Sequence, residues 1–536
     1  MDVKDRLGNF DPSLLDTTAR ANAGAGILNG FILPASASFG SIKGTPGVDR
    51  STLKSNSPNN WAPRVGMAWD VRGNGKTSVR AGYGLYYVRI SNQMLLQLIT
   101  GAPFFQLSSV VLPGTPDNNP FPNLPVPSQF PIFPTPPSFL GFSAAGSPRF
   151  SGPLLSLNPF ERGMHTPYVG SWNFTVQREL PGHFSIELGY LGTQGVKLLQ
   201  GRQLNQALLA NANHPIIVGG ANGVPATTLT TVSSRDANAR VPVLGFSTTG
   251  LNTVTGNGHS TYNAFVFTLN RRTTNMFFQG AYTYSKSIDN NSGSTTQDLG
   301  NSNGNQLDTR GVRGLSIFDR THRLQATYRY EIPAFRHTAG LLHHALGNWE
   351  FGGTSTFQSG LPFAITCAAC AGNVFGLSTS TLFPEVVGNL NQLRLPGNPQ
   401  QFTNSSSYNT GVLGATTLNT AGTTVSGFNI FGGAGSDSFT IGGPGTGSHV
   451  GSFFGNLGRD VPQSRGPRQQ QWEFYVGKNI PIRESVRLQF RTEFFNLFNH
   501  PNFTVTNTSF GTASFGRYDT PLGNPRVIQF ALKLRY

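Results

Sequence analysis

Two cysteines three positions apart are the residues whose spacing points most directly to chemistry. They are Cys367 and Cys370, in the segment ITCAACAG. Two cysteines cannot supply the four ligands of a structural zinc site, and no pair of histidines follows them at zinc-finger spacing. A thioredoxin-like redox pair requires a βαβ context, which the flanking sequence does not provide. We therefore expect a small loop disulfide in an oxidising compartment, with two idle thiols as the alternative.

Other segments that resemble reactive sites lack the residues that the chemistry needs. The segment DVRGNG (70–75) resembles the start of a calcium loop, but its third residue is Arg72 and the twelfth position is Ala81 instead of glutamate. The neighbours His343 and His344 suit a metal less well than a pair four residues apart. No phosphate-binding loop and no nucleophile elbow occurs. We expect no catalytic, metal-binding or cofactor-binding residues, and the protein is predicted not to be an enzyme.

The elements that position these residues are predicted to be β-strands, because polar and apolar residues alternate along many segments. In the final segment, VIQFALKLRY (527–536), Ile528 and Phe530 fall on one face, whereas Gln529 and Lys533 fall on the other. The pattern predicts about 11 strands. The segments are 63–71, 77–87, 171–180, 184–192, 262–272, 276–288, 321–332, 348–358, 471–480, 485–495 and 527–536.

Composition and charge decide which class of β-protein these strands form. Charged residues make up 12% of the chain, against about 25% in an ordinary soluble domain. No run of about 20 apolar residues could cross a membrane as a helix. Arginine, glutamate and glutamine recur in mid-strand on the polar face, and a packed dry interior could not hold such charges unpaired. In a transmembrane barrel the apolar face meets lipid and the polar face lines a water-filled interior, which fits both faces of these strands. The sequence therefore predicts an all-β, antiparallel transmembrane β-barrel.

The connections between the predicted strands are alternately short and long. The short ones include 72–76, which contains an Asn-Gly hairpin signal, and 181–183, 273–275 and 481–484. Short periplasmic turns and long extracellular loops are typical of outer-membrane barrels. The long connections are 89–167, 195–260, 289–319, 359–470 and 499–526.

The direction of the strands predicts an incomplete barrel. If Tyr536 lies on the periplasmic side, the segment 63–71 runs inward from the outside. Residues 1–62 would then be a loop, the N-terminal remnant of a truncated barrel, with 63–536 as the barrel part. The strand count is odd, whereas bacterial single-chain barrels have an even number. We therefore expect this chain to be a fragment, and the absence of a signal peptide at the first residues agrees with that expectation.

Several longer stretches, taken as a set, resemble one known family. They are NNWAPRVGMAWDVRGNGKTSVRAGYGLYY (59–87), NPFERGMHTPYVGSWNFTVQREL (158–180), YNAFVFTLNRR (262–272), AYTYSKSIDN (281–290), FDRTHRLQATYRYEIP (318–333), GNWEFGGTSTFQSGLPF (347–363) and FRTEFFNLFNHPNF (490–503). The family is the TonB-dependent outer-membrane receptors of the Oar-like type. The resemblance implies a barrel of about 22 strands with a plugged lumen, energised through TonB. The sequence contains no recognisable plug or TonB-contacting segment, so its strands would be the C-terminal half.

These features together predict a role in uptake. We expect part of an outer-membrane receptor that imports a bulky nutrient by ligand-gated active transport. Its partners would be outer-membrane lipid and, through a missing plug, a TonB-type energising complex. A non-transporting adhesion or structural barrel and a passive porin are the alternatives.

The charged residues give only general information about the ligand. The net charge is +15, but no concentrated basic run occurs, so nucleic-acid binding is not expected. Glu473 and Glu493 are predicted to be lumen-lining partners of arginines. No individual residue is assigned to ligand binding. Basic residues predicted on the polar face, which would suit an anionic ligand, are Arg323, Arg329, Arg487, Arg491, Lys533 and Arg535.

Overall fold

The computed structural model describes most of the chain. The described residues are 8–14, 30–39, 42–48, 60–88, 136–208, 210, 215–220, 223–230, 235–292, 304–306, 312–334, 346–367, 376, 382–386, 388–397, 402, 406–416, 441–442, 457–482 and 486–536. Their elements are β-strands and short 3-10 turns, with no α-helix among them. In the described residues, no helix is long and apolar enough to cross a membrane.

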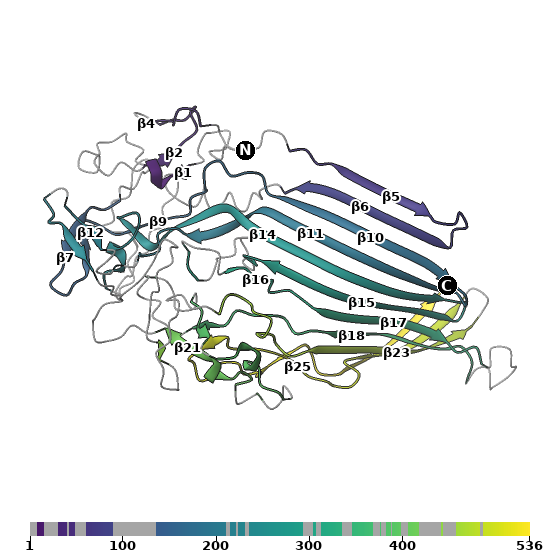
Figure 1. Cartoon of the computed structure of the whole chain (residues 1–536). Helices are drawn as coiled ribbons and strands as arrows, with labels where there is room; N and C mark the ends of the chain where they lie inside the picture. Colours follow the sequence, from purple (N-terminus) through teal and green to yellow (C-terminus); the bar gives the residue numbers. More distant parts are fainter. Residues whose placement is uncertain are drawn as a thin grey trace, which may run out of the picture.

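One large antiparallel sheet forms the body of the molecule (Figure 1). Eleven of its strands form a continuous path in which neighbours along the chain are neighbours in space. Each predicted segment overlaps one of these strands, with ends that differ by a few residues in most cases. The strands are β5 (Arg64–Asp70), β6 (Thr77–Tyr87), β10 (Tyr168–Leu180), β11 (Phe184–Gln203), β14 (Phe246–Arg272), β15 (Met276–Asp289), β17 (His322–Glu331), β18 (Trp349–Gln358), β23 (Gln469–Pro481), β24 (Arg487–Phe495) and β28 (Val527–Arg535).

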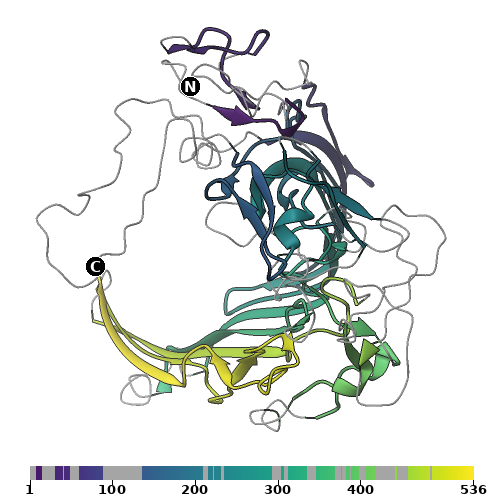
Figure 2. The ribbon, with the colours of Figure 1, turned by 90° about the vertical axis from the view of Figure 1, so that its left-hand side faces the viewer.

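The sheet is curved but open. Figure 2 shows it as an arc, and β5 and β28 are the two ends of the path, with no pairing between them among the described residues. Because every pair along the path is antiparallel and the number of strands is odd, β5 and β28 run in the same direction. Direct closure would therefore require a parallel pair, and the part of the chain that the structure describes forms an open arc and not a closed barrel.

The two ends of the sheet differ in their connections. At one end, here called the turn side, the strands are joined by brief hairpins at 181–183 and 273–275. The hairpin between β5 and β6 belongs to the same side, where Asp70 accepts hydrogen bonds from the backbone of Gly75 (2.7 Å) and Arg72 (3.3 Å). The segment that resembles a calcium loop is thus a capped turn. The opposite end, the loop side, carries the long connections.

Two strands are much longer than the sequence predicts. β11 contains 20 residues and β14 contains 27, whereas about 9–11 suffice to cross a membrane. Their pairing continues beyond Gly195 after β-bulges near Leu198, into residues predicted to be loop. Glycine and threonine interrupt the alternation there, which is why the periodicity did not reveal the extension.

The hydrophobic clusters of the described residues lie mainly on the loop side, and one of them includes Phe246 and Leu251 at the loop-side end of β14. The largest combines residues of β19 (Thr366–Cys367) and β26 (Ser509–Phe510) with buried Leu382, Tyr408 and Phe515. Residues near the N-terminus join another cluster, in which the Phe10 ring lies 5.2 Å from that of Phe31 and 5.1 Å from that of Phe246. The loop side is thus an ordered layer with its own packing, and the sheet projects from it.

The apolar face of the sheet is exposed to its surroundings. Its side chains include some of the most exposed large hydrophobic groups of the molecule, such as Phe530 (68%), Leu532 (67%) and Phe174 (48%). In water such a surface would be strongly unfavourable. An apolar solvent on this face removes that cost.

Candidate functional site

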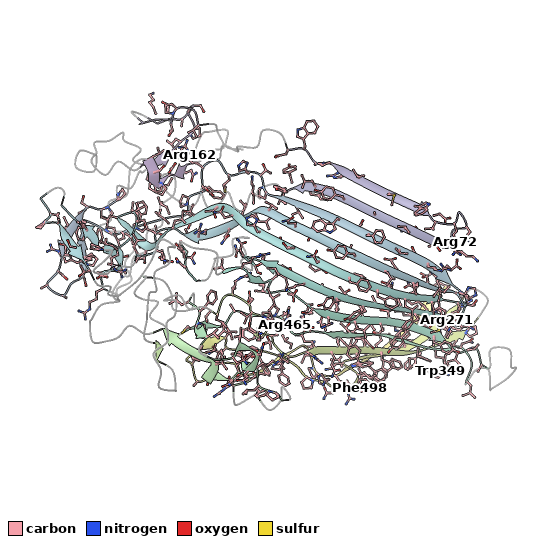
Figure 3. All side chains as sticks on the ribbon, viewed as in Figure 1. Arg72, Arg162, Arg271, Trp349, Arg465 and Phe498 are labelled. Carbon is pink, nitrogen blue, oxygen red and sulfur yellow. The ribbon has the colours of Figure 1, made fainter. Side chains whose placement is uncertain are left out.

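The candidate site is the polar face of the central strands, where charged side chains from four strands meet. Strand alternation places Arg329 of β17, Glu350 of β18 and Arg491 of β24 on this face, opposite the apolar side chains. Figure 3 shows side chains along both faces of the sheet. The predicted basic residue Arg329 therefore lies where the sequence placed it.

Glu350 is the centre of the polar face. Its carboxylate accepts hydrogen bonds from Arg329 Nε (3.2 Å) and Nη2 (3.0 Å), and from Gln489 Nε2 (3.0 Å). Its side chain is only 4% exposed. Arg329 also pairs with Glu331. A buried carboxylate is stable here because charged and polar donors surround it.

A glycine allows this contact to cross a strand. Glu350 and Gln489 belong to β18 and β24, which are separated by β23. Gly477 of β23 lies between them, and a Cβ atom there would be 3.0 Å from Glu350 Oε1. The absence of a side chain at Gly477 lets the carboxylate lie over the backbone and reach Gln489.

A second group on the same face surrounds Tyr475. The guanidinium carbon of Arg491 lies 3.7 Å from the centroid of the Tyr475 ring, and Arg491 Nε lies 2.7 Å from Glu493 Oε1. The ring lies over Gly352, where a Cβ would be 2.7 Å from Tyr475 Cε1. A cleft of about 350 Å³ runs beside this group and is lined by residues including Arg329, Thr354, Tyr475, Arg491 and Glu493.

The paired charges define what this face can bind. The prediction that Glu493 is an arginine partner is confirmed. Glu473 instead accepts a hydrogen bond from Gln471 (2.8 Å), and no ion pair to Glu473 occurs among the described residues. Because glutamates neutralise Arg329 and Arg491, the face is a mixture of donors and acceptors. Such a wall suits hydrated polar solutes of either sign, so the case for an anionic ligand is weakened.

Buried arginines fasten the loop layer to the ends of the strands. Arg459 pairs with Asp289 at the end of β15 and donates to the carbonyl of Val312 (3.0 Å). Arg465 pairs with Asp319 and donates to the carbonyl of Gly360 (3.1 Å). These contacts join residues far apart in sequence, and the alternation pattern gave no signal for them.

Asp460 is an unusual member of this layer. Its side chain is fully buried, its Oδ2 lies 3.2 Å from Arg459 Nη1, and neither of its carboxylate oxygens accepts a hydrogen bond from another described residue. Burial raises the pKa of Asp460 to about 6, although the charge of Arg459 opposes the shift. Asp289 adds to the rise in pKa through like-charge repulsion.

The predicted cysteine and histidine features are only partly described. Cys367 is fully buried and disulfide-bonded, whereas Cys370 lies outside the described residues, so the pairing of these two cysteines stays a prediction. His343 and His344 also lie outside the described residues. Among the residues that are described, no group of three or more His, Cys, Asp or Glu side chains could hold a metal ion.

Comparison with known proteins identifies the class of the chain. The family model described as "Outer membrane beta barrel domain" matches residues 1–529. No curated protein matches.

Three solved structures to which the chain is similar are a transporter and two receptors. The transporter YddB from Escherichia coli shares 10% identity at a TM-score of 0.38, over 89% of this chain and 40% of its own. The siderophore receptor PirA from Acinetobacter baumannii shares 9% sequence identity at a TM-score of 0.35, and the match covers 89% of this chain and 41% of PirA. The pyoverdine receptor FpvA from Pseudomonas aeruginosa shares 10% sequence identity at a TM-score of 0.32, and the match covers 88% of this chain and 35% of FpvA. The chain thus spans about 40% of the length of the structures it matches.

Proposed function

The chain belongs to the outer membrane beta-barrel domain family, and from this premise we propose that it is the C-terminal barrel portion of a TonB-dependent receptor of the Oar-like type. The protein resides in the outer membrane and is not an enzyme. Its proposed activity is the ligand-gated, active uptake of a bulky polar nutrient. The resemblance of its sequence segments to that receptor type supports the proposal.

The contrast between the two faces of the sheet is the observation that carries this function. One face exposes side chains such as Phe174 and Phe530, and the other holds the paired charges around Glu350. A transmembrane barrel alternates in this way because one face borders hydrocarbon and the other borders an aqueous lumen. The polar face is then the wall along which a hydrated ligand travels.

The open edges support the proposal that further strands complete the barrel. β5 and β28 each have one unpaired edge in the described part of the chain, and unpaired backbone groups are costly in hydrocarbon. Since these strands run in the same direction, an odd number of added strands would make every pair antiparallel. About 11 more would give the size of about 22 found in plugged transporters. Residues 63–536 would then be the C-terminal part, and 1–62 the remnant that precedes it.

The energising partner follows from the same assignment. A plugged barrel of this size requires a plug domain and contact with a TonB-type complex, and both belong to the proposal. The loop side would face the outside of the cell, where its ordered layer would capture the ligand. The chemical identity of that ligand is not specified by the neutralised charges on the polar face.

Two measurements on the product of the intact gene test this function. Cross-linking in the host cell, followed by antibody capture of the protein, is expected to recover a TonB-type protein. Vesicles that contain the purified protein are expected not to swell in small sugars, because a plug blocks the lumen. Rapid swelling without a cross-link would identify a passive porin. Tight vesicles without a cross-link would favour an adhesive or structural barrel.

A further inference from the structure

A large pocket lies on the loop side and opens toward the apolar face of the sheet. Its volume is about 1150 Å³. Three of its wall residues, Tyr282, Leu324 and Phe357, lie side by side on β15, β17 and β18 in register. They belong to the apolar set that borders lipid. Gln358 and Gln469, which are paired with each other and belong to the opposite set, also line the pocket. None of its lining residues lines the cleft beside Tyr475, so this pocket, here called the rim pocket, is separate from that cleft.

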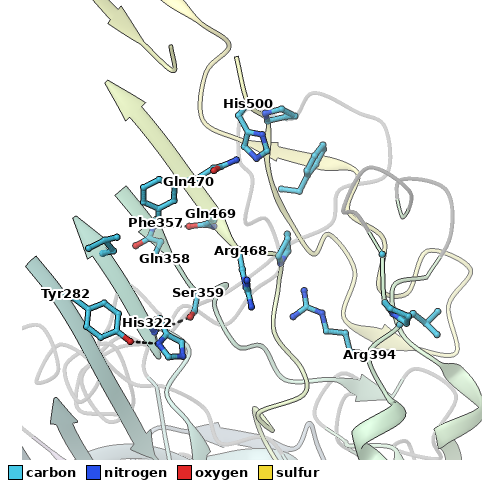
Figure 4. Close-up of a pocket in the computed structure, with 17 residues that line it drawn as sticks. Tyr282, His322, Phe357, Gln358, Ser359, Arg394, Arg468, Gln469, Gln470 and His500 are labelled. Atoms are coloured by element: carbon cyan, nitrogen blue, oxygen red, sulfur yellow. Dashed lines mark hydrogen bonds between the residues drawn. The ribbon is translucent and has the colours of Figure 1, made fainter. Parts of the chain in front are cut away.

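The upper wall of the rim pocket is basic. Arg394, from the loop between β18 and β23, and Arg468, which directly precedes β23, line it together with His500. Figure 4 shows Arg394 and Arg468 extending into the same opening from different segments. Both arginines are exposed.

Among the described residues, these positive charges have no acidic partner in the pocket. None of its lining residues is an aspartate or a glutamate. The contrast with the polar face is direct, because there Glu350 and Glu493 pair with the nearby arginines. An arginine pair without acidic partners favours an anion with several oxygens, such as a phosphate.

The position of the pocket beside the lipid-facing stripe indicates which kind of molecule carries that phosphate. Its floor continues the lipid-facing stripe of β17, which begins at His322 and runs through Leu324. The side chain of His322 is held by a 2.8 Å hydrogen bond between its Nδ1 and the hydroxyl of Tyr282. Aromatic residues at this level are typical of the interface between headgroups and hydrocarbon. The ligand must therefore present an anion above and hydrocarbon below.

We propose that the rim pocket binds the phosphorylated headgroup of an outer-leaflet lipid. Arg394 and Arg468 hold the phosphate, Gln358, Gln469 and Gln470 offer polar contacts to the rest of the headgroup, and Leu324 and Phe357 contact the start of the acyl chains. The site anchors the loop layer to the membrane surface. It rests on the outer-membrane location and on the outward-facing loop side, and it does not depend on whether the protein transports a ligand.

Lipid binding by the purified full chain in detergent micelles tests the proposal. The probes are radiolabelled lipid A with two phosphates, the same lipid without phosphates, and inorganic phosphate as competitor. The double variant R394Q/R468Q is expected to bind phosphorylated lipid A about 30-fold more weakly, since two basic contacts to a lipid surface are lost. R394K/R468K keeps the charge but loses the planar fork of the guanidinium, so it is expected to bind more tightly than R394Q/R468Q and more weakly than the native protein.

A matched variant controls for a general loss of positive charge. R72Q/K76Q removes two charges from the hairpin at the turn side, and Figure 3 places Arg72 at the end of the sheet opposite Arg465. Its binding is expected to change by less than about threefold, because this end lacks the pocket.

Four outcomes would overturn the proposal. Equal binding of phosphorylated and dephosphorylated lipid by the native protein would do so without any variant. Full affinity of R394Q/R468Q for phosphorylated lipid A would show that the two arginines do not bind the phosphate. An equal loss in R72Q/K76Q would indicate unspecific attraction. Displacement of the lipid by millimolar inorganic phosphate would identify a site for a free anion and contradict the assignment to a lipid.

Discussion

The apolar and polar faces of the large sheet are built from the same strands, one residue apart, and yet they are stabilised in different ways. On the apolar face, large side chains such as Phe174 and Phe530 are exposed and depend on the solvent that covers them. On the polar face, Glu350 is buried by its own partners and needs no external group. The apolar face therefore depends on the membrane for its stability, whereas the polar face is stabilised by hydrogen bonds and ion pairs between side chains of different strands.

The largest effect is expected from placing a charge on the apolar face. Phe174→Arg lies in the middle of β10 and should destabilise the folded protein in lipid vesicles by about 3 kcal/mol, because the guanidinium enters hydrocarbon. Asn173→Arg, one residue away at the same depth, should cost less than about 1 kcal/mol, since it faces the polar side. Urea titrations of folding into phosphatidylcholine vesicles measure both. Equal losses in the two variants would remove the distinction between the faces.

A smaller effect is expected from removing the central carboxylate of the polar face. Glu350→Ala takes a buried acceptor away from Arg329 and Gln489, and we expect a loss of about 2 kcal/mol, reduced from the full value because Arg329 is half exposed. Glu331→Ala breaks a more exposed contact with the same arginine and should cost about 0.5 kcal/mol. The same urea titration serves, and a larger loss in Glu331→Ala would contradict the central place of Glu350.

Substitution of two glycines tests how closely side chains of the polar face pack against the backbone. A Cβ at Gly352 would lie 2.6 Å from the carbonyl oxygen of Tyr328 and 2.7 Å from the Tyr475 ring, so Gly352→Ala should destabilise by about 1.5 kcal/mol through overpacking. Gly66→Ala in β5 is the control, because its nearest atom would be 3.9 Å away. Its stability should change by less than about 0.5 kcal/mol. A neutral Gly352→Ala would show that the ring does not lie over the backbone.

The smallest effect concerns the loop layer and its dependence on pH. The pKa of Asp460 is raised to about 6, so the folded layer favours the protonated form and gains stability as the pH falls from about 8 to 5. The gain is roughly 1 kcal/mol. Asp460→Asn should abolish this dependence. Hydrogen exchange of the Leu315 amide, which donates to the Asp460 carbonyl (3.2 Å), reports the opening after correction for intrinsic rates. A pH dependence that persists in Asp460→Asn would assign it to another group.

The sequence predicts the strands well because each face meets one uniform solvent. Alternation alone located all the strands of the main path, and it placed Arg329 and Arg491 on the polar face. It could not show that Glu350 reaches Gln489 over Gly477, because that contact depends on which strands become second neighbours. A glycine paired with a charged residue on the polar face, as Gly477 is with Glu350, is the sequence feature that could have predicted this contact.

The loop layer was largely beyond prediction. Arg459 and Asp289 are 170 positions apart, and nothing periodic connects them. The rim pocket likewise joins His322, at the start of β17, with Arg394 and His500 from two separate connections. Contacts of this kind arise from packing between loops, for which the chain carries no repeating local pattern.

Solvent accessibility along β10 tests the account most directly. Nitroxide labels placed singly at each position from 168 to 180, in protein folded into phospholipid vesicles, are compared for collision with oxygen, which dissolves in hydrocarbon, and with a nickel chelate, which stays in water. We predict a period of two, with oxygen dominant at Phe174 and nickel dominant at Asn173. Collision with nickel at both positions, or no alternation, would contradict the claim that the two faces border lipid and water.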